Sequence, residues 1–272
     1  MRTASREAYG DDDGVIFVKT VLRSHVGKVR QVNEDKAWSG HLAGGITAAI
    51  VADGMGGHLA GDVASALAVD SLVQSLQGAG GAITVQGGAV ILKEMIRKAN
   101  QVVYDTASMN EQYHNMGTTV VVALLDGNAG LIGHIGDSRA YRLREGRLEL
   151  LTEDHTLVNE LTKSGQLSPE EAAHHPRRNV LTRALGTDRS VEADVQEIVW
   201  QNGDVLLLCS DGLSGLVEPD IVQATLGEAK DPLEQHAQKL VDLAMAAGGD
   251  DNITVVLVTD DDWANAAGGE TA

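Results

Sequence analysis

Residues that build disulfide or aromatic scaffolds are scarce in this chain of 272 residues, which has one cysteine and 3% aromatic residues. A single thiol, Cys209, cannot close an intrachain disulfide, so a disulfide-stapled secreted scaffold is excluded and a reducing compartment is favoured. Because aromatic rings are few, aliphatic side chains must fill the interior. The hydrophobic content of 43% is enough for one large core.

Basic residues are also in the minority. Lysine and arginine together number 21 against 39 aspartates and glutamates, which gives a formal net charge of −18. Proteins that bind nucleic acids carry clustered positive charge that displaces counterions from phosphates. We therefore expect no nucleic-acid partner.

Long hydrophobic runs are missing as well. No stretch reaches the roughly 18 apolar residues of a membrane span, and the first residues, MRTASREAYGDDDG, are charged and contain no apolar signal segment. The sequence predicts a cytoplasmic protein without membrane attachment.

Several common catalytic and nucleotide-binding motifs are absent from the sequence. There is no GxxxxGK[ST] phosphate loop, no HExxH and no cysteine pair, and a dinucleotide fingerprint that starts at Gly54 would need glycine where Leu59 stands. The GLSGL stretch misses the serine nucleophile elbow, because its fifth position is Leu216. Covalent nucleophilic catalysis and zinc chemistry therefore lose support.

Apolar periodicity defines the expected elements. Helical spacing begins near Leu59 and near Ile91, a capped helix begins at Ser168, and the stretch 220–247 is expected to be helical. Two helices followed by a run of strands, rather than strict strand–helix alternation, predict an α+β fold with helices covering antiparallel sheet. Strands 117–151 are expected to form one antiparallel meander. The expected strands are 15–24, 45–53, 117–125, 130–137, 138–143, 148–151, 204–212 and 252–260.

Aspartates stand where four of these apolar strands meet a turn: Asp53, Asp137, Asp211 and the pair Asp250 and Asp251. One strand-end aspartate is usually a turn former. Four beside buried runs predict a cation site, because clustered carboxylates repel one another unless a cation lies between them. Oxygen ligands without cysteine-rich spacing favour Mg²⁺ or Mn²⁺.

The glycine-rich turn VADGMGGHLAGDVAS would let the backbone approach such an ion closely, so that the carbonyl of Gly54 becomes a candidate ligand. Two hard cations bridged by one carboxylate are a device for phosphoryl chemistry. The segment VRQVNEDK adds Arg30, whose planar fork suits a phosphate, and Glu34 and Asp35, which could orient metal-bound waters. For Arg30 alone, a surface salt bridge is the alternative.

Eight stretches then resemble the metal-dependent protein serine/threonine phosphatases of the PPM (PP2C) type in their bacterial form. They occur in family order from about Val15 to Asp260. The stretches are RQVNEDK, VADGMGGHLAGDVAS, MGTTVVVALL, GHIGDSRAYRL, LTEDHT, LTRALGT, LLLCSDGL and GGDDNITVVLV. The resemblance implies a four-layer α-β-β-α sandwich of two antiparallel sheets flanked by helix pairs.

The resemblance also implies roles for individual residues. Asp53 resembles the bridging carboxylate of a dinuclear Mn²⁺ or Mg²⁺ centre, and Gly54 its backbone-carbonyl ligand. The remaining direct ligands are Asp211 and Asp251. Asp35 holds a metal through water, Arg30 binds the phosphate, and Asp137 with Asp211 binds a third, weaker ion. Met55 occupies the place where animal members carry a histidine, the proposed general acid. The group that protonates the leaving alkoxide is therefore left open between His58 and a water on the third ion.

The implied activity is hydrolysis of phosphoserine and phosphothreonine in proteins, by a water that bridges two divalent metals. The implied partners are phosphorylated proteins and a cognate Ser/Thr kinase, and we expect a monomer. The alternatives are a catalytically silent binding module, disfavoured because the expected ligands are all present, and a regulatory phosphatase dedicated to one partner. We expect one domain at 15–260 with a mobile flap at about 155–190, between a disordered 1–14 and a flexible tail at 261–272. In the flap, Arg177, Arg178 and Arg183 form either an anion-docking surface or a solvated loop.

Overall fold

The computed structural model describes residues 18–56, 60–79, 85, 87–228 and 231–260. The predicted disordered start (1–14) and flexible tail (261–272) lie outside the described residues. So do 15–17 of the first expected strand and His58.

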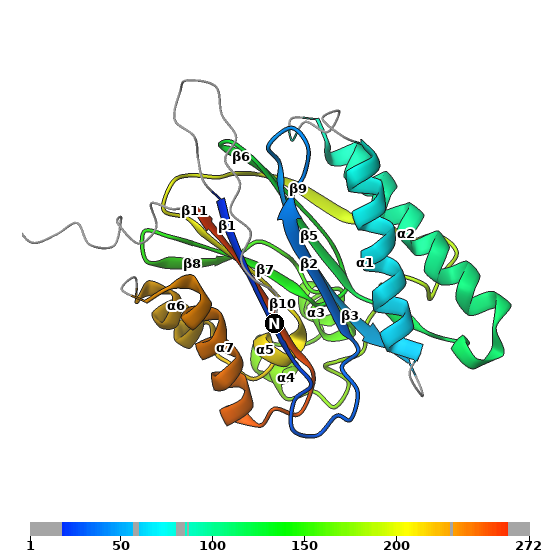
Figure 1. The fold of residues 1–272 in the computed structure, drawn as a ribbon. Coiled ribbons are helices and arrows are strands. Elements are labelled where there is room, and N and C mark those ends of the chain that lie inside the picture. Colours follow the sequence, from blue (N-terminus) through cyan, green and yellow to red (C-terminus); the bar gives the residue numbers. More distant parts are fainter. Residues whose placement is uncertain (1–17, 57–59, 80–84, 86, 229–230, 261–272) are drawn as a thin grey trace, which may run out of the picture.

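Two antiparallel sheets face each other in the centre of the molecule (Figure 1). The first sheet has the strand order β1 (Val18–His25), β11 (Ile253–Asp260), β10 (Val205–Cys209), β7 (Arg139–Arg144) and β8 (Arg147–Leu150). The second has the order β2 (Asp35–His41), β3 (Thr47–Met55), β5 (Val120–Asp126), β6 (Ala129–Ile135) and β9 (Asp194–Val199), and the short β4 (Gly117–Thr118) pairs with β3. The first sheet therefore joins the two ends of the described chain.

Helices cover the outer face of each sheet. The long α1 and α2 lie side by side on the second sheet, and α6 and α7 lie on the first, on the opposite side of the molecule (Figure 1). This arrangement confirms the expected four-layer α-β-β-α sandwich. The bounds are α1 (Ala60–Ala79), α2 (Ala89–Met109), the 3₁₀ turn η2 (Glu111–Tyr113), α3 (Leu157–Lys163), α4 (Pro169–Ala173), α5 (Asp211–Ser214), α6 (Pro219–Gly227) and α7 (Leu233–Ala247).

The central strands are mostly apolar because both of their faces are buried. In β3, Ala48, Ile50 and Ala52 pack under α1 and α2, whereas Ala49 and Val51 face the other sheet. The same alternation runs along β5, β10 and β11. A strand buried on both sides reads as a continuous apolar run, which is why the sequence predicts these four correctly.

The expected single meander over 117–151 is wrong. β5 and β6 belong to the second sheet, whereas β7 and β8 belong to the first, so the chain changes sheets between Ile135 and Arg139. Adjacent strands in the sequence often pair, but a turn can equally lead into a facing layer. This crossing places residues 136–138 at the edge of the sandwich, between both sheets.

Other elements also differ from expectation. The stretch 220–247, expected to be helical, is divided into α6 and α7. Helix α7 begins directly after Pro232, whose ring cannot continue a helix from α6. Strands β2 and β9 and helix α3 were not predicted. The buried face of α2 includes Leu92, Met95, Ile96, Ala99 and Val103, so Ile91, near which the predicted spacing begins, lies beside that face rather than in it.

Candidate metal and phosphate site

Two of the predicted carboxylates face each other across a strand pair. Asp35, the first residue of β2, stands opposite Asp53 near the end of β3. The Asp35 side chain is buried, and one of its oxygens, Oδ2, accepts a hydrogen bond of 2.8 Å from Ser210 Oγ. Ser210 follows β10 of the other sheet, so this bond joins the two sheets at one edge.

Two more carboxylates come from the first sheet at the same edge. Asp211 begins α5 directly after β10, and Asp251 precedes β11, the neighbour of β10. A hydrogen bond of 3.1 Å from the Ser210 amide to the Thr254 carbonyl continues the strand pairing up to this point. The carboxyls of Asp53 and Asp211 lie close enough to share a hydrogen bond when one is protonated.

Asp137 reaches the same edge from the turn between β6 and β7. Beside this turn, Thr119 Oγ1 lies 2.7 Å from Ser138 Oγ and accepts a hydrogen bond of 3.0 Å from the Asp53 amide. Thr118 Oγ1 donates to the Asp53 carbonyl at 2.8 Å. The backbones around Asp53 and Asp137 are thus joined through Thr119.

Crowding and burial raise the pKa of four of these carboxyls. Removal from water is the largest cause for each. It raises the pKa of Asp35 to about 7, with added repulsion from Asp211 and Asp251, and the pKa of Asp137 to about 7, with added repulsion from Asp211. The pKa of Asp53 rises well above its ordinary value through burial and the charges of Asp35 and Asp211, and that of Asp211 rises through burial and Asp251. The structure therefore brings the five predicted aspartates into one interacting cluster.

The donor set of this cluster fits hard divalent cations. Within the described part of the chain, the inner oxygens Asp35 Oδ1 and Asp211 Oδ1 are buried and accept no hydrogen bond. Buried oxygens without donors are costly unless a cation serves them. Gly54 lies against the start of α1, where a Cβ atom would overlap the carbonyl oxygen of Gly61 and lie 2.8 Å from that of Glu34. Only glycine lets β3 approach α1 this closely.

Arg30 lies beside this cluster, on the loop between β1 and β2. Its Nη2 donates to Asp251 Oδ2 at 2.7 Å, and its side chain keeps 48% of its exposure. The predicted phosphate ligand and the predicted metal ligand are therefore paired with each other, and the guanidinium still reaches solvent. The loop is held by Asn252, which donates to the carbonyls of Val26 and Val32 at 2.8 and 3.0 Å and accepts from the Glu34 amide at 2.7 Å.

The sequence reasoning assigned no role to Asn252 or to Ser210. Both stand in the quoted stretches, directly after Asp251 and directly before Asp211. Their position next to predicted ligands is the signal that could have found them. In the structure their hydrogen bonds connect separate elements.

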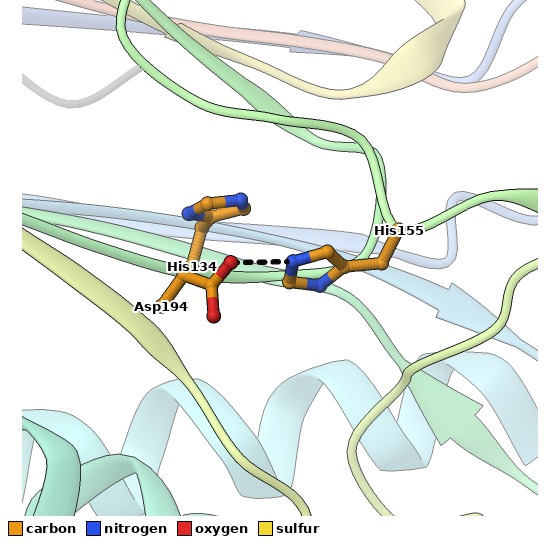
Figure 2. A group of neighbouring side chains, drawn as sticks. All are labelled: His134, His155 and Asp194. Atoms are coloured by element: carbon orange, nitrogen blue, oxygen red, sulfur yellow. Dashed lines mark hydrogen bonds and ion pairs between the residues drawn. The ribbon is translucent and has the colours of Figure 1, made fainter. Parts of the chain in front are cut away.

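A second group of chemically active side chains was missed entirely. His134 in β6, His155 after β8 and Asp194 in β9 offer ligand atoms that lie within 4.8 Å of one another, and the two imidazole rings are stacked with centroids 4.7 Å apart (Figure 2). Two histidines and a carboxylate form a set that would suit zinc.

Hydrogen bonds already engage three of the four ring nitrogens of the two histidines. His155 Nδ1 accepts a hydrogen bond of 3.1 Å from the Gly136 amide, so in the neutral ring the proton is on Nε2, which lies 3.1 Å from Asp194 Oδ2. His134 Nε2 lies 2.8 Å from the Glu153 carbonyl, which can only accept. Burial lowers the pKa of both histidines and keeps them neutral. We therefore interpret this group as a hydrogen-bonded cluster.

The basic residues of the predicted flap at about 155–190 divide into two kinds. Arg183 Nη1 donates to Asp194 Oδ1 at 3.0 Å and to the Glu192 carbonyl at 3.3 Å, so Arg183 is part of the structure at the base of the flap. Arg177 and Arg178 are exposed. The proposed anion-docking surface therefore cannot count Arg183 as a free cation.

A four-layer sandwich with clustered carboxylates at one edge, beside an arginine, defines the class of metal-dependent phosphohydrolases. The sequence matches the protein phosphatase 2C family over residues 23–256. The chain therefore belongs to this family of metal-dependent protein phosphatases. None of the helices in the described ranges has both the length and the apolar character needed to cross a membrane.

Known relatives resemble the chain over nearly their whole length. The serine/threonine phosphatase stp of Listeria monocytogenes is 39% identical over 240 residues, which are 88% of this chain and 95% of that protein. The serine/threonine phosphatase of S. agalactiae has a solved structure that is 35% identical with a TM-score of 0.84, covering 89% of this chain and 99% of that one. The catalytic domain of the serine/threonine phosphatase PstP, solved in complex with two manganese ions, is 34% identical with a TM-score of 0.78, covering 90% and 98%.

Proposed function

We propose that this chain hydrolyses phosphoserine and phosphothreonine in proteins at the cluster of strand-end aspartates. The observation that carries the proposal is the convergence of Asp35, Asp53, Asp137, Asp211 and Asp251, whose pKa values are raised at four of the five positions. Charges that repel in the absence of a cation are what a divalent metal site requires. The phosphatase relatives support the same reading.

The proposed ligands of two core Mn²⁺ or Mg²⁺ ions are Asp53, the carbonyl of Gly54, Asp211 and Asp251, with Asp35 acting through water. When bound, two such ions lower the pKa of a shared water and neutralise phosphoryl oxygens. Asp137 with Asp211 is the proposed site of a third, weaker ion.

The remaining tasks fall to the side chains themselves. Arg30 binds the phosphoryl group through its planar fork, which matches two phosphate oxygens. In the structure, Asp251 holds this fork beside the cluster of aspartates. Ser210 fixes the carboxylate of Asp35. Met55 cannot donate a proton, so the group that protonates the leaving alkoxide is not a side chain at that position.

The test is hydrolysis of a phosphothreonine peptide with and without Mn²⁺. Asp211→Asn and Asp53→Asn should each lower kcat/KM by at least about 100-fold, the size of effect seen when an electrostatic element of a catalytic site is removed. The matched control is Asp126→Asn, because Asp126 also ends a strand but lies at the other end of β5. Activity that survives EDTA, or that persists in the Asp211 variant, would refute the proposal.

A silent binding module makes the opposite prediction: Mn²⁺ binds, measured by calorimetry, and no phosphopeptide is hydrolysed. We further propose phosphorylated proteins as substrates, a cognate Ser/Thr kinase as the source of the phosphate groups, a monomeric state and a cytoplasmic location. The domain is proposed to span 15–260 with its flap at about 155–190. A phosphoproteome comparison after loss of the gene, and light scattering of the purified chain, test the partner and the monomer.

A further inference from the structure

His155 holds Gly136, the residue directly before Asp137, at both of its backbone groups. The His155 amide donates to the Gly136 carbonyl at 3.0 Å, and the Gly136 amide donates to His155 Nδ1 at 3.1 Å. A side chain that accepts from the same residue to which its own backbone donates forms a two-point clamp. The clamp fixes the direction in which the chain enters Asp137.

The ring of His155 is itself held from two further sides. Because Nδ1 accepts from Gly136, the proton on Nε2 is donated to Asp194, which also binds Arg183. The ring of His134 stacks on its face with an interplanar angle of 20° (Figure 2). Ring rotation would break a hydrogen bond at each nitrogen, so His155 has one orientation.

The opposite side of the Gly136 turn is closed by Thr119. Gly136 has a φ of +101°, a conformation that favours glycine, and a Cβ atom there would lie 2.6 to 2.7 Å from side-chain atoms of Thr119. Thr119 in turn contacts Ser138 and the Asp53 amide. The turn therefore contacts both Thr119 and His155.

We propose that His155 is a positioning residue that sets the place of Asp137 relative to Asp211 and couples it to the base of the flap. His155 is the first residue of the proposed flap, and its carbonyl accepts a hydrogen bond of 2.8 Å from the Thr182 amide on the returning segment of the flap. A change in the flap base would thus be transmitted to Gly136. The role of Asp137 as a metal ligand rests on the proposed function. The two hydrogen bonds between His155 and Gly136 do not.

Two substitutions separate the two nitrogens of the ring. In His155→Asn the amide oxygen takes the place of Nδ1 and can accept from Gly136, but the side chain no longer reaches Asp194. In His155→Gln the amide group reaches toward Asp194, but no acceptor remains at the Nδ1 position. His236→Asn is the matched control, because His236 is an equally buried histidine in α7, on the far helical layer.

The first measurement is hydrogen exchange of the Gly136 amide in the metal-free protein, followed by NMR. We expect His155→Gln to speed this exchange by about five- to tenfold, the factor that corresponds to one lost hydrogen bond. His155→Asn and His236→Asn should change it less than about twofold. The second measurement is Mn²⁺ titration by electron paramagnetic resonance, where His155→Gln should weaken the weakest-bound ion by a similar factor and His155→Asn should restore it.

Equal effects of His155→Asn and His155→Gln on exchange and on Mn²⁺ binding would overturn the proposal, as would unchanged exchange in His155→Gln. Loss of Mn²⁺ binding in the His236 control would also overturn it, since any buried histidine would then suffice. A wild-type protein that fails to hydrolyse phosphopeptides defeats the proposed function, while the exchange experiment still decides the clamp.

Discussion

Replacing Asp53 by asparagine should stabilise the metal-free protein while it removes the cation site. Burial removes the Asp53 carboxylate from water and neighbouring carboxyls repel it, so its charge raises the free energy of the folded state. Asparagine has nearly the same shape, carries no charge and can donate to Asp211. The substitution therefore removes repulsion without creating a cavity.

The magnitude follows from the raised pKa values. For Asp35, a pKa that rises from 3.8 to about 7 corresponds to a cost on the order of 4 kcal/mol at pH values above 7. The carboxyls share this cost, and Asp53 is only partly buried, so one neutral substitution relieves part of it. We expect a gain of about 1 to 3 kcal/mol in the free energy of unfolding at pH 8.

The pH dependence has a definite sign. Each raised pKa means that the folded state binds protons more tightly than the unfolded chain, so the stability of the metal-free wild type rises as the pH falls through about 7. The advantage of Asp53→Asn should therefore shrink between pH 8 and pH 5. His134 and His155, whose pKa values are lowered by burial, change the free energy of unfolding with pH in the opposite direction. This contribution cancels when the variant and the wild type are compared at the same pH.

The assay is urea unfolding followed by tryptophan fluorescence, in EDTA and in Mn²⁺. Trp200 is fully buried and reports the core between the sheets. The free energy of unfolding of the wild type should rise with the Mn²⁺ concentration, because the folded state binds the ion, and that of the variant should rise far less. A variant that is less stable than the wild type in EDTA at pH 8, or that keeps the full Mn²⁺ gain, refutes the reasoning; Asp126→Asn should stay within about 0.5 kcal/mol.

Three further predictions follow from single side chains. In steady-state kinetics, Arg30→Ala should raise KM for a phosphothreonine peptide by about 10- to 100-fold, because a charge-assisted hydrogen bond contributes about 1.5 to 3 kcal/mol. Arg30→Lys should recover only part of the lost affinity, because lysine has no planar fork. Gly54→Ala should lower the free energy of unfolding in urea by at least about 1 to 3 kcal/mol, because the added Cβ atom would overlap Gly61. Its control is Gly78→Ala in α1, where the added Cβ atom has open space; this variant should be neutral or more stable by up to about 1 kcal/mol. Burial raises the pKa of the Cys209 thiol to about 12, so a thiol reagent at pH 8 should label it only after unfolding, measured by mass spectrometry.

The sequence predicts elements best where burial is symmetric. β10 is apolar throughout and β11 is mostly apolar, because one face of each strand meets helices and the other meets a sheet. β2 and β9 were missed because their residues are largely half-exposed and mix charged with apolar side chains, as edge strands do. Periodicity cannot distinguish such a strand from a loop.

The aspartates of the candidate site could be predicted from the sequence, whereas the contacts that support them could not. Strand ends with aspartate are local features, so Asp53 and Asp211 stand out in the sequence. The contact between His155 and Asp194 joins residues 39 positions apart and depends on the chain changing sheets at Gly136, which the expected meander did not contain. His155 also binds the backbone amide of Gly136, and a contact with a backbone amide cannot be recognised from the side chains in a sequence.

The pairing of Arg30 with Asp251 suggests why cation and phosphate binding should favour each other. A chain with a net charge of −18 repels a phosphorylated substrate, and five clustered aspartates strengthen that repulsion at the site. A cation that occupies Asp251 competes with Arg30 for the same carboxylate, and so frees the guanidinium fork for a phosphate. The cation thus supplies positive charge and also releases a second positive group. Because the same free energy couples both events, a bound phosphate must strengthen cation binding by the same factor.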